Sequence, residues 1–220
     1  MDNLCAAAAA AIAAGHEILV LSDRADTGIN ADTTYIPPLM AVGAVHHYLI
    51  HAGLRLKASL VVDTAQCWST HHFACLLGYG ANAVLPYLAL ETVRQWWHLP
   101  RTQTLMTRDK LPQVTLEEAQ VNFRKAVEAG LFKILSKMGI SLLASYQAAQ
   151  VFEAIGIGTD LLELAFKGTA SRLGGLRIVD LAQETLGFHA SAFPELNRQK
   201  LDNFRLYSVP SWGRVPHEQP

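Results

Sequence analysis

Three short apolar runs, each followed by polar residues and then by a helical pattern, constrain the fold of this chain most strongly. The runs span residues 17–21, 57–62 and 81–85. Strands that alternate with helices in this way are typical of parallel sheets joined by right-handed crossovers. The sequence therefore predicts an α/β fold. Half of the 220 residues are hydrophobic, as expected for a sheet that helices cover on both faces.

The segments between these runs contain residues that typically begin or end helices. Prolines suit the first turn of a helix and glycines its end, so Pro38 and Pro86 mark two starts and Gly15, Gly53 and Gly78 mark three ends. We expect a polar loop at residues 27–35. The sequence predicts helices over residues 6–14, 38–52, 66–77 and 86–97.

For the carboxyl-terminal half of the chain, the sequence predicts mostly helices. Thr115 and Glu118 have the spacing of a capping box, and Gly139 is placed to end the helix that they begin. Before this helix, the polar residues 98–112 with prolines near both ends predict a loop. After it, the sequence predicts helices at residues 144–154, 160–166 and within 176–193, and a turn-rich segment at 168–175.

Composition and charge argue against several classes of protein. The net charge is −1 and the basic residues are scattered, so we expect neither a nucleic acid nor a membrane as partner. The alanine-rich segment reaches Glu17 too soon to span a bilayer. Cys5, Cys67 and Cys75 lack C-x-x-C spacing, which predicts reduced thiols and neither a disulfide framework nor a tetrahedral zinc site.

Clustered histidines are one candidate for chemistry. His47 and His51 lie four residues apart, a spacing at which two imidazoles can bind one metal ion. The glutamate of an H-E-x-x-H motif is absent and the sequence suggests no third ligand, so packing or hydrogen bonding is the preferred interpretation. Three further histidines, His46, His71 and His72, are part of the same clusters.

Polar residues after the strands and a glycine-rich segment are the other candidates. Asp23, Arg24 and Asp63 could line a cleft for acid–base chemistry, although capping of helices is the commoner use of such residues. The segment Gly168-Thr-Ala-Ser-Arg-Leu-Gly-Gly175 could wrap a phosphate, or form a turn in which Ser171 caps a helix. Lys137 suits the end of a helix. Because nucleophile, base and orienting group do not occur together, we assign no catalytic, cofactor-binding or metal residue.

Several stretches resemble, in order, the central domain of the glutamate synthase large chain. The resemblance covers residues 17–204, and residues 96–115 are closer to the ferredoxin-dependent branch. The matching stretches are Ile18-Leu-Val-Leu-Ser-Asp-Arg24, Pro38-Leu-Met-Ala-Val-Gly-Ala-Val-His-His47, Ser59-Leu-Val-Val-Asp63, His71-His-Phe-Ala74, Gly78-Tyr-Gly-Ala-Asn-Ala83, Pro86-Tyr-Leu-Ala-Leu-Glu91, Lys133-Ile-Leu-Ser-Lys-Met-Gly-Ile-Ser141, Gln150-Val-Phe-Glu-Ala154 and Gly168-Thr-Ala-Ser-Arg-Leu-Gly-Gly175.

This resemblance implies a part of an enzyme that makes two glutamates from glutamine, 2-oxoglutarate and reduced ferredoxin. In that family a cysteine amidotransferase domain releases ammonia, and FMN with an iron–sulfur cluster delivers electrons. The central domain, an incomplete βα-barrel-like unit, connects these parts. Cys5 does not match the amidotransferase cysteine, and three closely spaced cluster cysteines are absent. The resemblance therefore implies a scaffold without catalysis of its own, whose partners are the flanking domains.

The domain limits and the alternatives follow from the same reasoning. We expect residues 1–204 to be the central domain, incomplete at its amino end, and residues 205–220 to be an irregular tail. Read one nucleotide later, suitable codons for this tail give the family's Gly-Gly-Glu-Tyr-His, so a frameshift is our hypothesis. The alternatives are a stand-alone phosphate- or FMN-binding module and a docking protein. The resemblance implies the bacterial cytoplasm, or the plastid stroma of a photosynthetic eukaryote.

Overall fold

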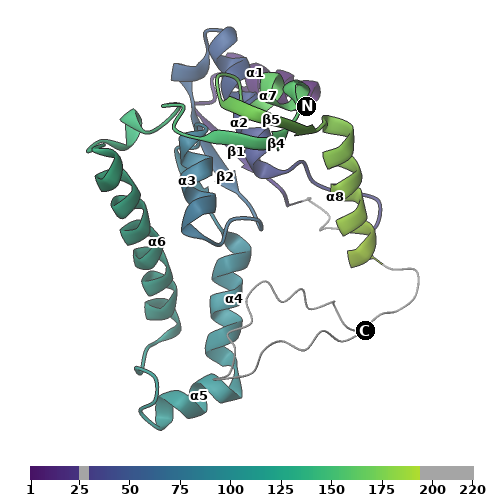
Figure 1. Ribbon diagram of the computed structural model, residues 1–220. Helices are drawn as coiled ribbons and strands as arrows, with labels where there is room; N and C mark the ends of the chain where they lie inside the picture. Colours follow the sequence, from purple (N-terminus) through teal and green to yellow (C-terminus); the bar gives the residue numbers. More distant parts are fainter. Residues whose placement is uncertain (25–29, 194–220) are drawn as a thin grey trace.

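The computed structural model describes residues 1–24 and 30–193, which form a mixed α/β fold (Figure 1). The expected loop at 27–35 lies partly, and the tail at 205–220 wholly, outside the described residues. As predicted, three parallel strands form the first sheet, and the structure places them in the order β1-β2-β3. The two described sheets are short and neither closes into a barrel. The first half contains α1 (Asp2–Ala13), β1 (Ile18–Ser22), α2 (Pro38–His51), β2 (Ser59–Asp63), α3 (Thr70–Gly78) and β3 (Ala83–Leu85).

Within the described residues, helices cover one face of this sheet and leave the other face open. Side chains alternate between the faces, and Leu19 and Leu60 are buried in one core cluster with residues of α1, α2 and α7 (Thr159–Ala165). The register pairs Val20 with Val61 and Val61 with Ala83, so these residues share the opposite face. There Ile18 is 66%, Val20 60% and Leu85 44% exposed. An uncovered apolar face is unusual for a parallel sheet.

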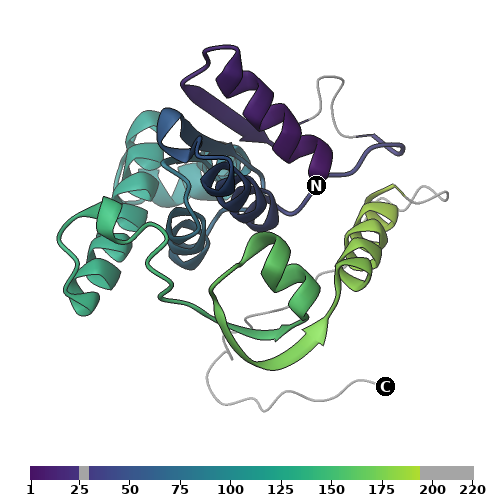
Figure 2. The same ribbon diagram turned by 90° about the horizontal axis from the view of Figure 1, so that it is seen from above.

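Helix α2 lies at the centre of the core. Eight of its residues are buried, and α1 and α7 pack against it. Figure 2 shows α1, in purple, on the side of α2 opposite the green strands β4 (Glu153–Ile157) and β5 (Ala170–Leu176). Gly43 lets α7 approach closely, because a Cβ at this position would overlap the backbone of Ala165. The packing of α2 therefore depends on the absence of one side chain.

Helix α3 begins later than the predicted residue 66. Its N-cap is Ser69, whose hydroxyl accepts a hydrogen bond from the His72 N–H at 3.4 Å. The preceding residues form a loop in which Thr64 and Cys67 are fully buried. The apolar and buried positions of this loop explain why the sequence pattern extended the helix too far.

An arm of three helices extends from the end of β3 (Figure 1). It consists of α4 (Tyr87–His98), α5 (Pro100–Thr107) and α6 (Leu116–Met138), and α6 returns alongside α4 and α3. The predicted capping box is confirmed: the Glu118 N–H donates to Thr115 Oγ1 at 3.1 Å and the Thr115 N–H donates to the Glu118 carboxylate at 2.7 Å. Gly139 ends α6 with a φ of 70°, as expected.

The predicted loop at residues 98–112 was wrong, because α5 lies within it. Pro100 occupies the first turn, and Thr102 and Met106, four residues apart, are buried on one side of the helix. Besides Pro100, the helix contains only Leu105 and Met106 as large apolar residues, too few for a helical period to appear in the sequence. Burial of Thr102 and Met106 on one side stabilises this helix, which has no continuous hydrophobic stripe.

The last third differs from the prediction in two segments. It contains β4 (Glu153–Ile157), α7 (Thr159–Ala165), β5 (Ala170–Leu176) and α8 (Ile178–Ala192), with β4 and β5 forming a parallel two-stranded sheet. The helix predicted at residues 144–154 was wrong, since Ala148 and Gln150 have positive φ angles that end helical geometry. The segment 168–175 was expected to be a turn and is largely strand β5. The helices predicted at 160–166 and within 176–193 are confirmed as α7 and α8.

Candidate functional site at the strand ends

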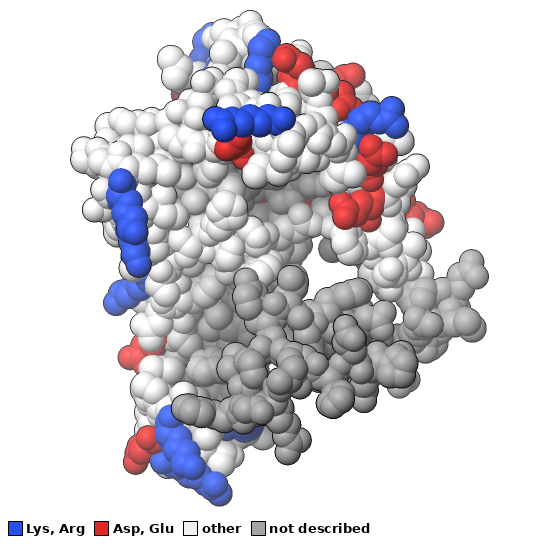
Figure 3. Space-filling model, in the orientation of Figure 1, with Lys and Arg blue, Asp and Glu red and all other residues white. Residues whose placement is uncertain are grey.

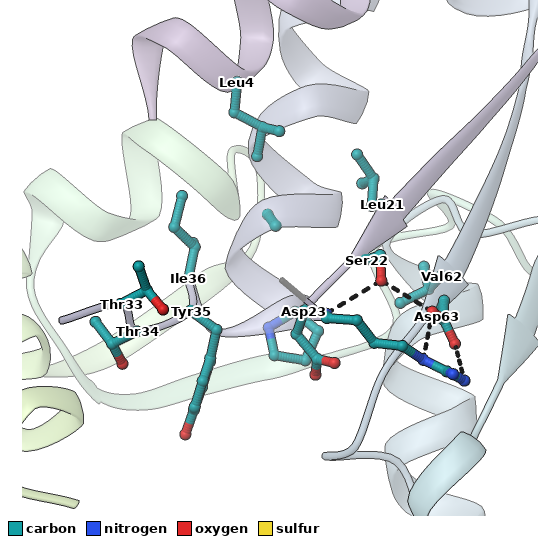
Figure 4. Close-up of a pocket in the computed structure, with 13 residues that line it drawn as sticks. Leu4, Leu21, Ser22, Asp23, Thr33, Thr34, Tyr35, Ile36, Val62 and Asp63 are labelled. Carbon is teal, nitrogen blue, oxygen red and sulfur yellow. Dashed lines mark hydrogen bonds and ion pairs between the residues drawn. The ribbon is translucent and has the colours of Figure 1, made fainter. Parts of the chain in front are cut away.

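Polar side chains converge where β1 and β2 end (Figure 4). Ser22 and Asp63 are paired in the register of the sheet, and the Ser22 hydroxyl donates to Asp63 Oδ2 at 2.8 Å. Arg24 approaches the same carboxylate with two nitrogens, Nε at 2.9 Å from Oδ2 and Nη2 at 3.0 Å from Oδ1. Such a two-point contact holds the guanidinium in a fixed orientation. Both oxygens of Asp63 are therefore engaged by neighbouring side chains.

Arg24 also joins the sheet to helix α4. Its guanidinium carbon lies 3.8 Å from the ring centroid of Tyr87, which is the first residue of α4. This is a cation–π contact, in which the negative ring face attracts the positive charge. The position of Arg24 is thus set by a carboxylate on one strand and by an aromatic ring on the following helix.

Asp23 engages a second group of residues. Its Oδ2 accepts hydrogen bonds from Thr64 Oγ1 at 2.6 Å and from the Ala65 N–H at 2.9 Å. Its Oδ1 is buried and has no hydrogen-bond partner within residues 1–24 and 30–193. Burial, followed by the interaction with this carboxylate, raises the pKa of Tyr87 to about 12. Tyr87 therefore stays protonated at neutral pH.

Two cavities meet at Asp23. The first has a volume of about 270 Å³ and lies against the strand ends between Leu4 and Tyr35. The second has a volume of about 510 Å³ and lies beyond Asp23, toward α3 and α4. In Figure 4 the side chains of Asp23 and Tyr35 point in the same direction, away from Leu4. The residues lining the second cavity are Asp23, Tyr35, Ala65, Gln66, Trp68, His72, Tyr87 and Leu88.

The sequence predicted part of this arrangement. Asp23, Arg24 and Asp63 do meet at the carboxyl edge of the sheet, and the preferred expectation that they cap helices was wrong, because the caps of α2 and α3 are Pro37 and Ser69. The sequence missed Tyr35, Trp68 and Tyr87, which come from separate loops and a helix start. Since Asp63 is paired with Arg24, the two carboxylates do not form an acid–base pair.

The histidine cluster serves mainly to hold the structure together. His46 Nδ1 accepts a hydrogen bond from Arg55 Nε at 2.9 Å, and burial with the nearby Arg55 charge lowers the pKa of His46 to about 4. Burial and His51 lower the pKa of His47. Nowhere in the described part of the chain do three His, Cys, Asp or Glu side chains gather as a metal site would require.

The cysteines and the glycine segment do not fit the cofactors of the resembled family. Cys67 is fully buried, and burial raises the pKa of its thiol to about 12 and that of Cys75 to about 11. The cysteines are free and do not gather as iron–sulfur ligands. Ser171 lies in β5, where its hydroxyl donates to the Leu173 carbonyl at 3.3 Å and caps no helix. The proposed phosphate wrap at residues 168–175 thus loses its structural basis.

Basic and acidic side chains of the described residues are interspersed on the face drawn in Figure 3. Among the described helices, none is long and apolar enough to cross a membrane.

Comparison with known proteins gives the family. Residues 1–158 match the glutamate synthase central domain. Ferredoxin-dependent glutamate synthase 2 of Synechocystis sp. is 63% identical over 100% of this chain, and ferredoxin-dependent glutamate synthase of Pyropia yezoensis is 56% identical over 100% of it. The corresponding chloroplastic/mitochondrial protein 1 of Arabidopsis thaliana is 56% identical over 99% of the chain. The chain spans 13% to 14% of the length of these relatives. This chain therefore belongs to the glutamate synthase central domain family.

Proposed function

We propose that this chain is the central scaffold region of a ferredoxin-dependent glutamate synthase. The whole enzyme would convert glutamine and 2-oxoglutarate to two glutamates with electrons from reduced ferredoxin. The proposal is supported by relatives that carry this name and are 56% to 63% identical over essentially the whole chain. The relatives include a protein of Synechocystis sp. and a chloroplastic protein of Spinacia oleracea, so we place the protein in a cytoplasm or in a plastid stroma.

The proposed scaffold role is supported by the hydrogen bonds and the ion pair that the polar side chains at the strand ends form with one another. In α/β enzymes this edge carries the chemistry. Here Asp63 accepts a hydrogen bond from Ser22 and forms an ion pair with Arg24, and one oxygen of Asp23 accepts hydrogen bonds from Thr64 and Ala65. Groups that bind one another in this way hold the sheet edge together. FMN and the iron–sulfur cluster would then be held by other parts of the enzyme, with residues 1–204 linking the amidotransferase and FMN domains.

We also propose that the first sheet is part of an incomplete βα-barrel-like unit. Its strands follow one another in space as in sequence, and the connecting helices α2 and α3 contact each other. The apolar side chains Ile18 and Val20 then occupy the face that would be the interior of a barrel. In the whole enzyme, the remainder of the polypeptide would cover this face.

A substitution on the open face tests the scaffold role in the full-length synthase. Val20→Arg places a charge there without disturbing the core, since Val20 is already exposed. We expect glutamine hydrolysis and oxidation of reduced ferredoxin to persist separately, while glutamate formation from glutamine falls severalfold. Val121→Arg, an exposed valine on α6, is the matched control and should leave all three rates unchanged.

The competing explanations give different results. Unchanged glutamate formation in the Val20→Arg enzyme would contradict the scaffold role of this face. Stoichiometric FMN binding by the 220-residue chain alone would instead support an independent cofactor module. Because the second measurement needs no flanking domain, the two outcomes are separable.

A further inference from the structure

The second cavity beside Asp23 combines aromatic walls with one acidic group. Tyr35, Trp68 and Tyr87 contribute rings to its lining, together with His72. The Trp68 and His72 rings meet edge to face, with centroids 4.8 Å apart and planes at 88°. The cavity is about 510 Å³, which is ample for the end of a long side chain. These rings come from a loop, from the approach to α3 and from the start of α4.

Asp23 is the one acidic residue among the lining residues, and its neighbours are neutral. The His72 ring accepts a hydrogen bond at Nδ1 from the Trp68 N–H at 3.5 Å, and burial with the nearby His71 lowers the pKa of His72. Tyr87 is protonated, as described above. Apart from the interaction of the Asp23 carboxylate with the Tyr87 hydroxyl, the buried Oδ1 of Asp23 has no hydrogen-bond partner among the described residues, and burying a carboxylate oxygen in this state is costly. The cavity therefore favours a ligand that donates hydrogen bonds and carries positive charge.

The nearby Arg24 does not supply the hydrogen-bond donor and positive charge that Asp23 lacks. Its nitrogens contact Asp63, and its charge lies against the face of Tyr87 at 3.8 Å. Counting Asp23 and Asp63 against Arg24 leaves one formal negative charge in the group. Aromatic faces also attract cations. We propose that this cavity binds the ammonium or guanidinium group of a lysine or arginine side chain on a partner polypeptide.

A polypeptide fits better than a free small cation because of the cavity rim. Trp68 is 59% and Leu88 48% exposed, so a cation alone would leave both side chains in water. A segment that carries apolar residues beside its lysine or arginine would cover them. The inference deepens the proposed scaffold role and rests on it for the partner, which would be another segment of the same enzyme.

Titration of the 220-residue chain with a short peptide tests the cavity. The probe is acetylated Ala-Leu-Lys-Leu-Ala amide, and the comparison peptide has norleucine in place of lysine. Binding is followed by chemical-shift changes of the Trp68 indole N–H and its neighbours. We expect saturable binding of the lysine peptide, and binding weaker by about tenfold for the norleucine peptide.

Variants identify the groups responsible. Asp23→Asn and Trp68→Leu should each weaken binding by about tenfold. Asp32→Asn makes the same charge change outside the cavity and should have little effect. Near-ultraviolet circular dichroism establishes that each variant is folded before it is titrated.

Three results would overturn the proposal. These are equal affinity for the two peptides, undiminished binding by the folded Asp23→Asn variant, and binding of n-butylammonium as tight as that of the lysine peptide. The last would identify a small-cation site. None of these results bears on the coupling experiment at Val20, so the failure of one proposal is distinguishable from the failure of the other.

Discussion

Arg55 connects three parts of the chain through a single guanidinium. It donates to His46 Nδ1 on α2 at 2.9 Å, to the carbonyl of Ala58 before β2 at 2.7 Å and to the carbonyl of Gly80 after α3 at 2.7 Å. Because the donor is charged, each of these hydrogen bonds is stronger than one between neutral groups. The arrangement requires a neutral His46, because a protonated imidazole cannot accept at Nδ1.

This requirement predicts a loss of stability in mild acid. The pKa of His46 is about 4 in the fold, against an ordinary value of 6.5. Between these values the unfolded chain binds the proton more tightly, so stability is fully present above pH 6.5 and falls as the pH drops toward 4. We expect a loss of about 2 kcal/mol, since water screens part of the full effect.

Urea unfolding at several pH values checks this prediction. His46→Asn keeps an acceptor for Arg55 and removes the titrating ring, so its stability should fall less between pH 6.5 and pH 4 than that of the unaltered protein. Equal losses in the two proteins would assign the acid sensitivity to other groups.

The ion pair at the strand ends should also contribute measurably. Asp63→Asn removes the charge that holds Arg24 and weakens the contact with Ser22. Because the Asp63 side chain is only 13% exposed, we expect a cost of about 1–2 kcal/mol, measured by urea unfolding. Glu91→Gln breaks a comparable pair with Arg94 on the surface of α4 and is the control. If both substitutions shifted the unfolding midpoint equally, the strand-end pair would have no special role.

At the scale of elements, the contact between α2 and α7 depends on Gly43. Gly43→Ala would place a methyl group against the Ala165 backbone, so the helices must separate. We expect a cost of about 1–3 kcal/mol in urea unfolding. Gly187→Ala, in α8, meets nothing within 4 Å and should raise stability slightly through helix propensity. Opposite signs for the two variants are the prediction, and a neutral Gly43→Ala would contradict it.

The capping box gives a prediction for α6 alone. Thr115→Ala removes the hydroxyl that accepts from the Glu118 N–H, and we expect a loss of about 1 kcal/mol. Hydrogen exchange in the first turn of α6 should accelerate at the same time. Thr104→Ala removes a hydroxyl that donates to the Pro100 carbonyl within α5, so little change is expected. Unchanged exchange in the Thr115→Ala variant would show that packing fixes this helix start.

Local signals predicted those elements that local chemistry determines. The capping box, Gly139 and the helix start at Pro38 are read from neighbouring residues, and each was confirmed, while Pro86 directly precedes α4 instead of lying in its first turn. Strands β4 and β5 depend on pairing with each other, and α5 depends on burial of Thr102 and Met106, so neither left a period in the sequence. At the site, Asp23, Arg24 and Asp63 followed from the rule for strand ends. Tyr87 and Trp68 could not, because only the folded chain brings them to Asp23.

At the scale of the whole molecule, helices α2 and α7 lie between the two described sheets. Helices α2 and α7 contact each other, α2 lying against the first sheet and α7 connecting the strands of the second (Figure 2). Each sheet leaves apolar side chains exposed: Ile18 and Val20 on the first, and Ile155 and Leu173 on the second. A chain with such faces would be expected to bind other apolar surfaces, including those of its own copies.

This expectation is tested by making the first face polar. Ile18→Thr with Val20→Thr keeps β-branched side chains in the strand and removes apolar surface that is already in contact with water. We expect unchanged stability, weaker fluorescence of an added hydrophobic dye and less self-association in sedimentation measurements. Val121→Thr with Val179→Thr, on α6 and α8, removes exposed apolar surface elsewhere and should change neither measurement. If both pairs lowered dye binding equally, general surface hydrophobicity would explain it. A selective effect of the first pair would identify the open sheet face as the surface through which this chain associates with other apolar surfaces.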